Sequence, residues 1–332
     1  MQSCAQASRP PSRPGGRFRH RAHFAVTRGA LSRLAPSSLL SFYVCSAYKE
    51  NGLVTSDVIL VNLTAYNLVM LLTRGLPNIL FIFGLANVLS DAHCQLLVYT
   101  SRVCRAMSIC LTCFLSCFQC VTIMSTSSTC MSVRLRLQAN VGPIIIFLLI
   151  MNGTMCIAPL LFTVSGTNVT NLEYAFRVSY CIVILPDKAS LVSNNFILFA
   201  RDFVFVTGMS VASGSMLFTL YKHRKQVKGI RSAERTQALC AEVRASKMVS
   251  ALVALYVLFF GIDNSIWFYQ NTSPKNILTS TSEIRSFFSV CYASVFPFII
   301  VFFSRKLLLS IRRYTKEKHH ISKGISAITI AK

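Results

Sequence analysis

The chain has 332 residues, of which 53% are hydrophobic and only 14% are charged, a balance that excludes an ordinary soluble globular protein. The 34 lysines and arginines outnumber the 11 acidic residues, but the basic residues lie in short segments between long uncharged runs. No RNP-like motif, zinc-finger spacing or aromatic-interleaved basic helix accompanies them. The pattern therefore argues against nucleic acid as a partner and predicts a lipid bilayer instead.

Residues 1–53 form an Arg-rich N-terminal segment with at most a partial first helix. Glu50 is its only acid, and no signal peptide is visible. The most apolar stretch, Leu34–Tyr48, has 15 residues that include Pro36 and four serines, which is too short to cross about 30 Å of hydrocarbon. The Pro, Gly and Arg content through Arg33 predicts disorder, although an Arg- and Ser-rich, acid-poor start also resembles an organelle transit peptide.

Residues 54–303 are predicted to form an all-α transmembrane helix bundle, followed by a basic cytoplasmic tail over residues 304–332. Runs of about 20 apolar residues are long enough to cross a bilayer as helices. Such runs occur at Asp57–Phe83, Leu96–Met124, Val141–Val164, Val192–Tyr221, Met248–Phe268 and Ser286–Phe303. Prolines inside three of them are compatible with membrane helices, where neighbouring helices and side chains satisfy the freed backbone groups.

Lysine and arginine are concentrated in every second connection between these runs. Residues 125–140 contain Arg134 and Arg136 without an acid, and residues 222–247 contain eight basic residues against two acids. The tail contains eight basic residues against one acid. The positive-inside rule places these segments, and with them the C-terminus, in the cytoplasm. Six crossings then place the N-terminus there as well.

Four of the 13 cysteines share one face of the second run, because they lie three or four residues apart; they are Cys110, Cys113, Cys117 and Cys120. No histidine lies inside a run, so we interpret these cysteines as small residues that let helices pack closely, not as metal ligands. Cys94 and Cys181 lie on the outer side, where an oxidising compartment allows a bridge. Asn168 and Asn271, in outer connections, match the glycosylation pattern.

Six ionisable residues lie within the apolar runs, where each costs free energy unless it faces a cavity or a partner. All fall in or near the outer half of the predicted bundle; they are Arg74, Arg102, Arg105, Arg201, Asp202 and Asp263. This sorting by depth favours a water-filled pocket open to the outside, and a surplus of about two positive charges favours an anionic or carbonyl-rich small ligand. A structural role is the alternative, in which Arg201 reaches lipid headgroups. Arg102 or Arg105 then pairs with one of the two aspartates to hold helices together.

The cytoplasmic side has two basic helical patterns. Lys222–Arg231 continues the fourth run as a basic helix, and Lys306–Tyr314 is amphipathic and suits the membrane interface. Basic helix ends of this kind bind acidic lipid headgroups or dock into an acidic groove of a partner protein. Both options stay open.

Several long, gapless segments resemble one receptor family. They are NLTAYNLVMLLTRGLP (Asn62–Pro77), SRVCRAMSICLTCFLSCFQCVTI (Ser101–Ile123) and ASGSMLFTLYKHRKQVKGI (Ala212–Ile230), with FGLANVLSDAHC before the second run, AEVRAS entering the fifth and SVFPF in the sixth. These segments resemble the vomeronasal type 1 receptors, whose fish members are also called class A-related olfactory receptors. The resemblance covers about residue 40 to residue 308.

The resemblance implies a rhodopsin-like, seven-helix receptor in the plasma membrane that binds a small-molecule chemosignal and couples to a heterotrimeric G protein of the inhibitory type. By position it also implies a disulfide between Cys94 and Cys181 and a glycan on Asn168. The candidate ligand-binding residues are Arg74, Arg102, Arg105, Asp202 and Asp263. The candidate G-protein-facing residues are Arg134, Arg136, Lys222, Arg224 and Lys225.

The chain departs from receptor patterns at three places. CVTIMSTSS stands where most rhodopsin-like receptors, though not this family, have Asp-Arg-Tyr, and FPFIIVF replaces Asn-Pro-x-x-Tyr in the sixth run. Where the family has a full first helix, this chain has only SSLLSFYVCSAYKE (Ser37–Glu50) behind the Arg-rich segment. Two explanations stay open, a wrongly joined first exon or a real loss of the first helix.

Other classes of protein fit the residues less well. The main alternative is a truncated, non-signalling receptor relic, because a missing first helix removes packing from the second and seventh helices. A mitochondrial carrier requires a threefold Pro-x-Asp/Glu-x-x-Lys/Arg repeat, a six-helix channel requires a TVGYG-like filter, and a six-span transporter with inverted repeats requires paired broken helices; the sequence shows none of these. No set of nucleophile, base and orienting residue is recognisable, so we expect neither an enzyme nor a cofactor or metal.

Overall fold

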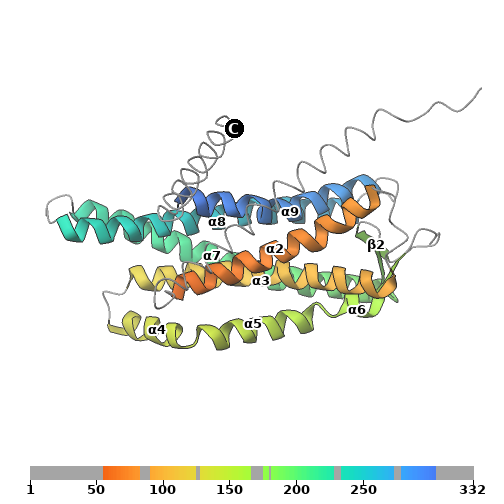
Figure 1. Cartoon of the computed structure of the whole chain (residues 1–332), viewed down its shortest axis with the longest axis horizontal. Coiled ribbons are helices and arrows are strands. Elements are labelled where there is room, and N and C mark those ends of the chain that lie inside the picture. Colours follow the sequence, from red (N-terminus) through yellow and green to blue (C-terminus); the bar gives the residue numbers. More distant parts are fainter. Residues whose placement is uncertain are drawn as a thin grey trace, which may run out of the picture.

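The computed structural model describes residues 55–82, 90–124, 128–165, 175–178, 181–227, 233–272 and 278–303. Within these residues the chain forms an elongated bundle of long, roughly parallel helices with a small sheet at one end (Figure 1). The predictions for residues 1–53, for Asn168 and for the tail 304–332 lie outside the described residues.

Six long stretches of helix match the six predicted apolar runs. They are α2 (Thr55–Ile82), α3 (Asp91–Ile123), α5 (Val141–Met155) with α6 (Ala158–Phe162), α7 (Lys188–Val227), α8 (Ala233–Thr272) and α9 (Leu278–Phe303). The described residues contain five helices that are long and apolar enough to cross a membrane, one for each of the first five runs. The sixth run lies on α9, whose apolar stretch Cys291–Ile300 is shorter. The predicted all-α bundle of membrane-length helices is confirmed.

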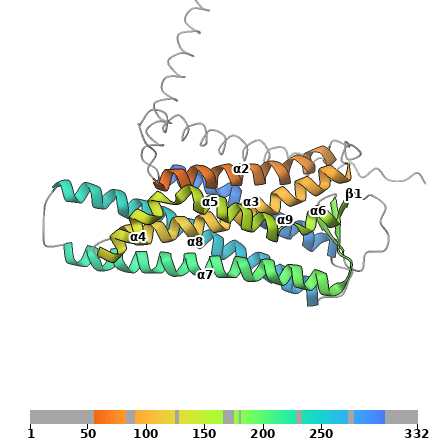
Figure 2. The ribbon, with the colours of Figure 1, turned by 90° about the horizontal axis from the view of Figure 1, so that it is seen from below.

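Helix α3 is the central element of the bundle. It contacts α2, α5, α6, α7 and α8, and the described core gathers around its buried Met107, Leu111 and Leu115. Seen from below, α3 lies between α2 on one side and α7 on the other (Figure 2). Any residue on its inward face therefore meets side chains from several other helices.

Two of the cysteines on α3 are packing residues, as the sequence predicts. Cys110 and Cys113 are buried, and Cys113 Sγ lies 3.4 Å from the point where Gly208 of α7 would carry a Cβ. This close approach is useful because helices in lipid associate through van der Waals packing at small residues. Cys117 and Cys120 are half-buried on the same helix.

The third predicted run is broken where the sequence suggests one continuous helix. Helix α5 ends at Met155, Cys156 caps it by donating its N–H to the carbonyls of Asn152 and Thr154, and α6 begins at Ala158. Pro159 in the first turn of α6 lacks an N–H, and its ring clashes with the carbonyl of residue 155 in an unbroken helix. The proline therefore explains the break.

Helix α4 (Ser128–Ala139) lies in the connection between the second and third apolar runs, where we expected a loop. Its residues, STCMSVRLRLQA, contain neither glycine nor proline, and Met, Arg, Leu, Gln and Ala all favour helix. The helix was not predicted because the segment is polar, and a basic stretch between apolar runs has no apolar periodicity. In Figure 1, α4 runs almost in line with α5.

A three-stranded antiparallel sheet lies in the connection between α6 and α7, which was also expected to be a loop. Its strands β1 (Thr163–Ser165), β2 (Ala175–Val178) and β3 (Cys181–Ile184) have the order β1–β3–β2. The central strand β3 is apolar and β-branched, CIVI, and its Val183 pairs with Thr163 on one side and Phe176 on the other. Strands this short carry too few residues for an alternating pattern to be recognised.

Candidate functional site

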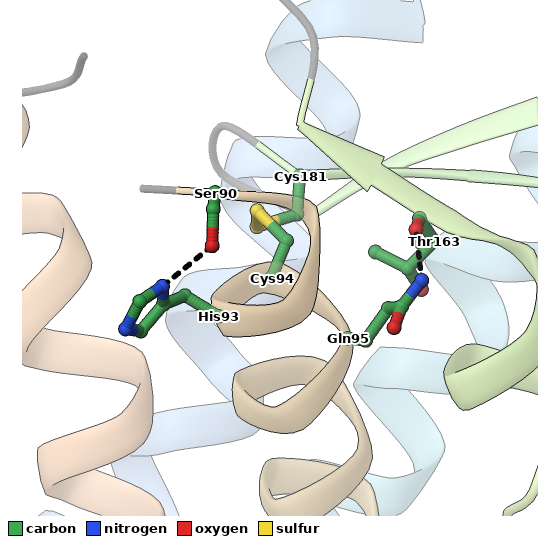
Figure 3. Close-up of a disulfide and its surroundings, with 6 residues drawn as sticks. All are labelled: Ser90, His93, Cys94, Gln95, Thr163 and Cys181. Atoms are coloured by element: carbon green, nitrogen blue, oxygen red, sulfur yellow. Dashed lines mark hydrogen bonds between the residues drawn. A yellow bond between two sulfur atoms is a disulfide. The ribbon is translucent and has the colours of Figure 1, made fainter. Parts of the chain in front are cut away.

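The sheet is attached to α3 by a disulfide between Cys94 and Cys181 (Figure 3). Beside the bridge, Gln95 Nε2 donates to the carbonyl oxygen of Thr163 at 3.2 Å. Both cysteines are buried in a small apolar cluster that includes Val183 of β3. The predicted bridge is confirmed. We call this end of the bundle the disulfide end, and the opposite end, where α4, the last turns of α7 and the first turns of α8 lie, the basic end (Figure 1).

An ion pair joins α3 to α8 inside the bundle. Arg105 Nη2 donates to Asp263 Oδ2 at 2.7 Å across 158 residues of sequence. The carboxylate side chain is 5% exposed, whereas the arginine side chain is 25% exposed. The interpretation that Arg105 pairs with an aspartate of another helix is therefore confirmed.

A second ion pair lies on α7 between neighbouring residues. Arg201 donates through Nε and Nη2 to the same carboxylate oxygen of Asp202, at 2.9 and 2.7 Å. Its Nη1 reaches Cys156 Sγ at 3.4 Å, at the break between α5 and α6. Only 7% of the Arg201 side chain is exposed. The structural alternative, in which Arg201 reaches lipid headgroups, is wrong, because the adjacent carboxylate and the thiol of Cys156 hold its guanidinium against the bundle.

The two ion pairs form one ionic cluster, which consists of Arg105, Arg201, Asp202 and Asp263. Asp202 of α7 lies within electrostatic range of Arg105 of α3, which contacts Asp263 of α8 directly. Charges of alternating sign from α7, α3 and α8 thus offset one another within the bundle. Such pairing is what makes ionised side chains tolerable at membrane depth.

The other two candidate arginines lie nearer the disulfide end. Arg102 precedes Arg105 by three residues on α3, or about 4.5 Å along the axis. Arg74 follows Asn67 by seven residues on α2, or about 10 Å, and Asn67 accepts a hydrogen bond from Ser108 of α3 at 2.8 Å. Both arginines are half-buried. The structure therefore brings three of the five candidate ligand-binding residues into the ionic cluster and places the other two on its disulfide-end side.

A cluster of neutral polar residues lies on the other side of the ionic cluster. We call it the polar cluster; it consists of Asn67, Ser108, Thr112, Tyr256 and Tyr292. Ser108 receives a hydrogen bond from the Tyr256 hydroxyl, and the Thr112 and Tyr292 hydroxyls lie 3.4 Å apart. The Tyr256 and Tyr292 rings are in contact, with centroids 3.6 Å apart. This cluster joins α2, α3, α8 and α9 at one level.

The polar cluster was not among the predicted site residues, because uncharged side chains carry no obvious cost in an apolar run. Its signal is a periodic one on α3. Polar residues recur there every three or four positions and so share a face; they are Arg105, Ser108, Thr112, Ser116 and Gln119. The last of them donates to Ser56 of α2 at 3.3 Å.

The candidate G-protein-facing residues lie on elements at the basic end. Arg134 is half-buried and Arg136 is exposed on α4, and Lys222 is exposed on α7. Arg224 and Lys225 lie on the last turns of α7, and their side chains are outside the described residues. Figures 1 and 2 show α4 and the far ends of α7 and α8 at the same end of the bundle.

Comparisons with known proteins agree with this arrangement. The chain is 38% identical over 283 residues to the olfactory receptor class A-like protein 1 of Danio rerio, a match that covers 85% of this chain and 88% of that protein. It is 27% identical over 284 residues to the human vomeronasal type-1 receptor 3, covering 84% and 90% of the two chains. The crystal structure of squid rhodopsin superposes with a TM-score of 0.71 at 14% identity, over 91% of this chain and 82% of that one.

The rhodopsin similarity shows the fold, a rhodopsin-like helix bundle of a multi-pass membrane protein. A model of the vomeronasal organ pheromone receptor family matches residues 30–312. The family and the fold are those of chemosensory G-protein-coupled receptors, which are not enzymes. The chain therefore belongs to the vomeronasal organ pheromone receptor family.

Proposed function

We propose that this receptor binds a small anionic chemosignal between the ionic cluster and the disulfide end, and that it signals to a heterotrimeric G protein of the inhibitory type at the basic end. The observation that carries the proposal is the placement of four arginines and two aspartates in the half of the bundle below the sheet. Four arginines against two aspartates leave a surplus of about two positive charges, and Arg74 and Arg102 lie on the disulfide-end side of the ionic cluster. A guanidinium binds a carboxylate or a sulfate through two parallel hydrogen bonds.

Orientation in the plasma membrane follows from the basic segments. Arg134, Arg136 and Lys222 lie at the basic end, and the positive-inside rule assigns that end to the cytoplasm. The disulfide end then faces the oxidising exterior, where a bridge such as Cys94–Cys181 is stable. A glycan on Asn168 belongs to the same side.

Coupling to a G protein is supported by family membership and by the exposed basic surface of α4 and α7. Arg136 and Lys222 are exposed there and can dock into an acidic groove. The inhibitory type of the G protein is carried over from the family resemblance. We propose these two residues, with Arg134, Arg224 and Lys225, as the contacts.

The test is a signalling assay in cells that express the full chain with an inhibitory G protein. We expect responses to small carboxylic acids or sulfates and none to the corresponding primary amides or alcohols. Arg102→Gln and Arg74→Gln each lower potency at least tenfold, since a hydrogen bond to a charged group contributes about 1.5–3 kcal/mol. If the receptor responds to neutral compounds, and still does so in both variants, the anionic ligand is refuted. If the receptor reaches the cell surface folded but activates no G protein, the non-signalling relic is favoured.

A further inference from the structure

We propose that Asp263 is an internal stand-in for the acid group of the ligand. Its carboxylate occupies the anion position on Arg105 and holds α8 against α3, and the carboxylate or sulfate of an arriving ligand takes that position. This exchange rests on the proposed function only for the identity of the arriving anion. The ion pair itself is a feature of the fold, and Asp263 becomes a residue that determines specificity and restrains the resting state.

The geometry of the pair favours exchange at the arginine. The Asp263 side chain is almost fully enclosed, at 5% exposed, whereas Arg105 keeps 25% of its side-chain surface exposed. A second anion therefore has a side from which to approach the guanidinium. A guanidinium has five N–H donors in a planar fork and accepts a second carboxylate without losing its shape.

The neighbouring ion pair has the opposite character. Arg201 and Asp202 are adjacent on α7, and their side chains are 7% and 12% exposed. An exchange there moves no helix relative to another. Of these two ion pairs, the one between Arg105 and Asp263 is the one that connects two helices. Asp202 therefore provides a matched control, a buried carboxylate in the same ionic cluster whose direct ion pair stays within one helix.

Displacement of Asp263 has a mechanical consequence for α8. Displacement removes the ion pair that joins α8 to α3 at this level, so α8 can move sideways, away from α3, at Asp263. Seven residues toward the basic end, Tyr256 is held to Ser108 by a hydrogen bond and to Tyr292 by ring contact. The polar cluster then acts as a pivot between the two ends of α8.

The lever arms of this pivot are unequal. About 10 Å of helix separates Tyr256 from Asp263, and about 35 Å separates it from Ala233, where α8 begins. If α8 tilts as a rigid rod about Tyr256, a shift of about 1 Å away from α3 at Asp263 becomes a shift of about 3 Å in the opposite direction at Ala233. A ligand that replaces one carboxylate thereby changes the surface on which a G protein would dock.

The first experiment uses purified full-length receptor in lipid nanodiscs and needs neither a native ligand nor a G protein. Asp263→Ala removes the stand-in, and sodium propionate is the probe, compared with sodium chloride at equal ionic strength. We expect propionate to raise the Tm of Asp263→Ala by several degrees, as binding to the folded state alone requires. The wild type needs at least tenfold more propionate for the same rise in Tm, because Asp263 competes with propionate for Arg105. Arg105→Gln/Asp263→Ala and Asp202→Ala show no such rise.

The second experiment measures helix position with isosteric variants, which keeps the test valid if Asp263→Ala folds poorly. Spin labels on unnatural amino acids at Met124 and Lys247, both exposed toward the basic end, report the α3–α8 distance. Because Lys247 lies about 14 Å from Tyr256 on the side opposite Asp263, Asp263→Asn shortens this distance by about 1 Å for each ångström that Asp263 moves away from α3. Asp202→Asn leaves the distance as in the wild type, and the charge swap Arg105→Asp/Asp263→Arg restores it.

The outcomes separate this proposal from the proposed function. An unchanged distance in Asp263→Asn, or a propionate response that is equal in Asp202→Ala, overturns the stand-in even if the receptor signals normally in cells. Conversely, a propionate response confined to Asp263→Ala, together with the shortened distance in Asp263→Asn, supports it even if no G protein couples.

Discussion

The hydroxyl groups of Ser108 on α3 and Tyr256 on α8 are joined by a hydrogen bond, although 148 residues separate them in sequence. The same Ser108 hydroxyl donates to Asn67 Oδ1 on α2 at 2.8 Å, and the ring of Tyr256 contacts Tyr292 on α9. One serine thus lies where four helices meet. This position explains why α3 is polar on the face that points into the bundle, although most of its neighbours are apolar.

The first prediction concerns the energetic coupling of Ser108 and Tyr256. Tyr256→Phe keeps the ring contact and removes one interhelical hydrogen bond, so it costs about 0.6–1.7 kcal/mol of stability. Ser108→Ala costs more, because it also leaves the Asn67 carbonyl oxygen without its donor. The double variant costs less than the sum of the two. Thermal unfolding of the four purified receptors measures the cycle, and additivity within about 0.3 kcal/mol would contradict the shared bond.

The second prediction concerns the contact between α3 and α5. Tyr99 Oη donates to the carbonyl oxygen of Gly153 at 3.2 Å, and a Cβ on Gly153 would lie 3.1 Å from that hydroxyl. Gly153→Ala therefore pushes the tyrosine away and costs about 0.5–1.5 kcal/mol through the lost hydrogen bond. Gly142→Ala on the same helix has open space around its Cβ and is neutral or stabilises by up to about 1 kcal/mol.

Two measurements check this contact. The unfolding temperature of Gly153→Ala should fall, whereas that of Gly142→Ala should rise or stay unchanged. Placing Gly153→Ala in a Tyr99→Phe background removes the atom that it displaces, so its additional cost should shrink. If Gly153→Ala is as harmful in that background as in the wild type, the Tyr99 hydroxyl is not the cause.

The apolar runs and the charges inside them were predictable, because both are local properties of the sequence. Any 20-residue window shows whether a helix can cross a bilayer, and an arginine such as Arg105 is conspicuous within one. The partner of Arg105 was not predictable, because sequence separation does not indicate which residues pair. Arg201 pairs with its direct neighbour Asp202, whereas Arg105 pairs with Asp263, which is far away in the sequence. Only the packing of α3, α7 and α8 decides which arginine meets which aspartate.

The sheet and the polar cluster could not be predicted for a different reason. β3 has four residues, and its identity as a strand depends on neighbours at Thr163 and Phe176 that belong to other parts of the chain. Ser108 and Thr112 are individually ordinary in a membrane helix, where a hydroxyl can bond to its own backbone, as Thr112 does to the Ser108 carbonyl at 2.8 Å. Their shared face becomes meaningful only when the helices that cover it are known.

The third prediction concerns the disulfide. The bridge between Cys94 and Cys181 closes a loop with a sequence separation of 87 residues, and loss of a native disulfide typically costs roughly 2–5 kcal/mol. We expect Cys94→Ser and Cys181→Ser to lower surface expression and Tm equally, and the double variant to be no worse than either. Cys130→Ser, at a half-buried free cysteine on α4, is the control and should change stability by less than about 0.5 kcal/mol. Unequal single variants, or an additive double variant, would show that the thiols act separately.

The last prediction concerns how the two ends of the chain lie across the membrane. Six predicted crossings and the basic segments place both termini on the cytoplasmic side, so epitope tags at Met1 and after Lys332 should bind antibody only in permeabilised cells. A third tag inserted between Pro186 and Asp187, which are exposed beside the sheet, is the control and should be labelled on intact cells. Labelling of the Met1 tag on intact cells would mean that the region around Leu34–Tyr48 crosses the bilayer as a seventh helix. Surface labelling of the inserted tag with both termini inside would instead establish a receptor that reaches the plasma membrane with six crossings.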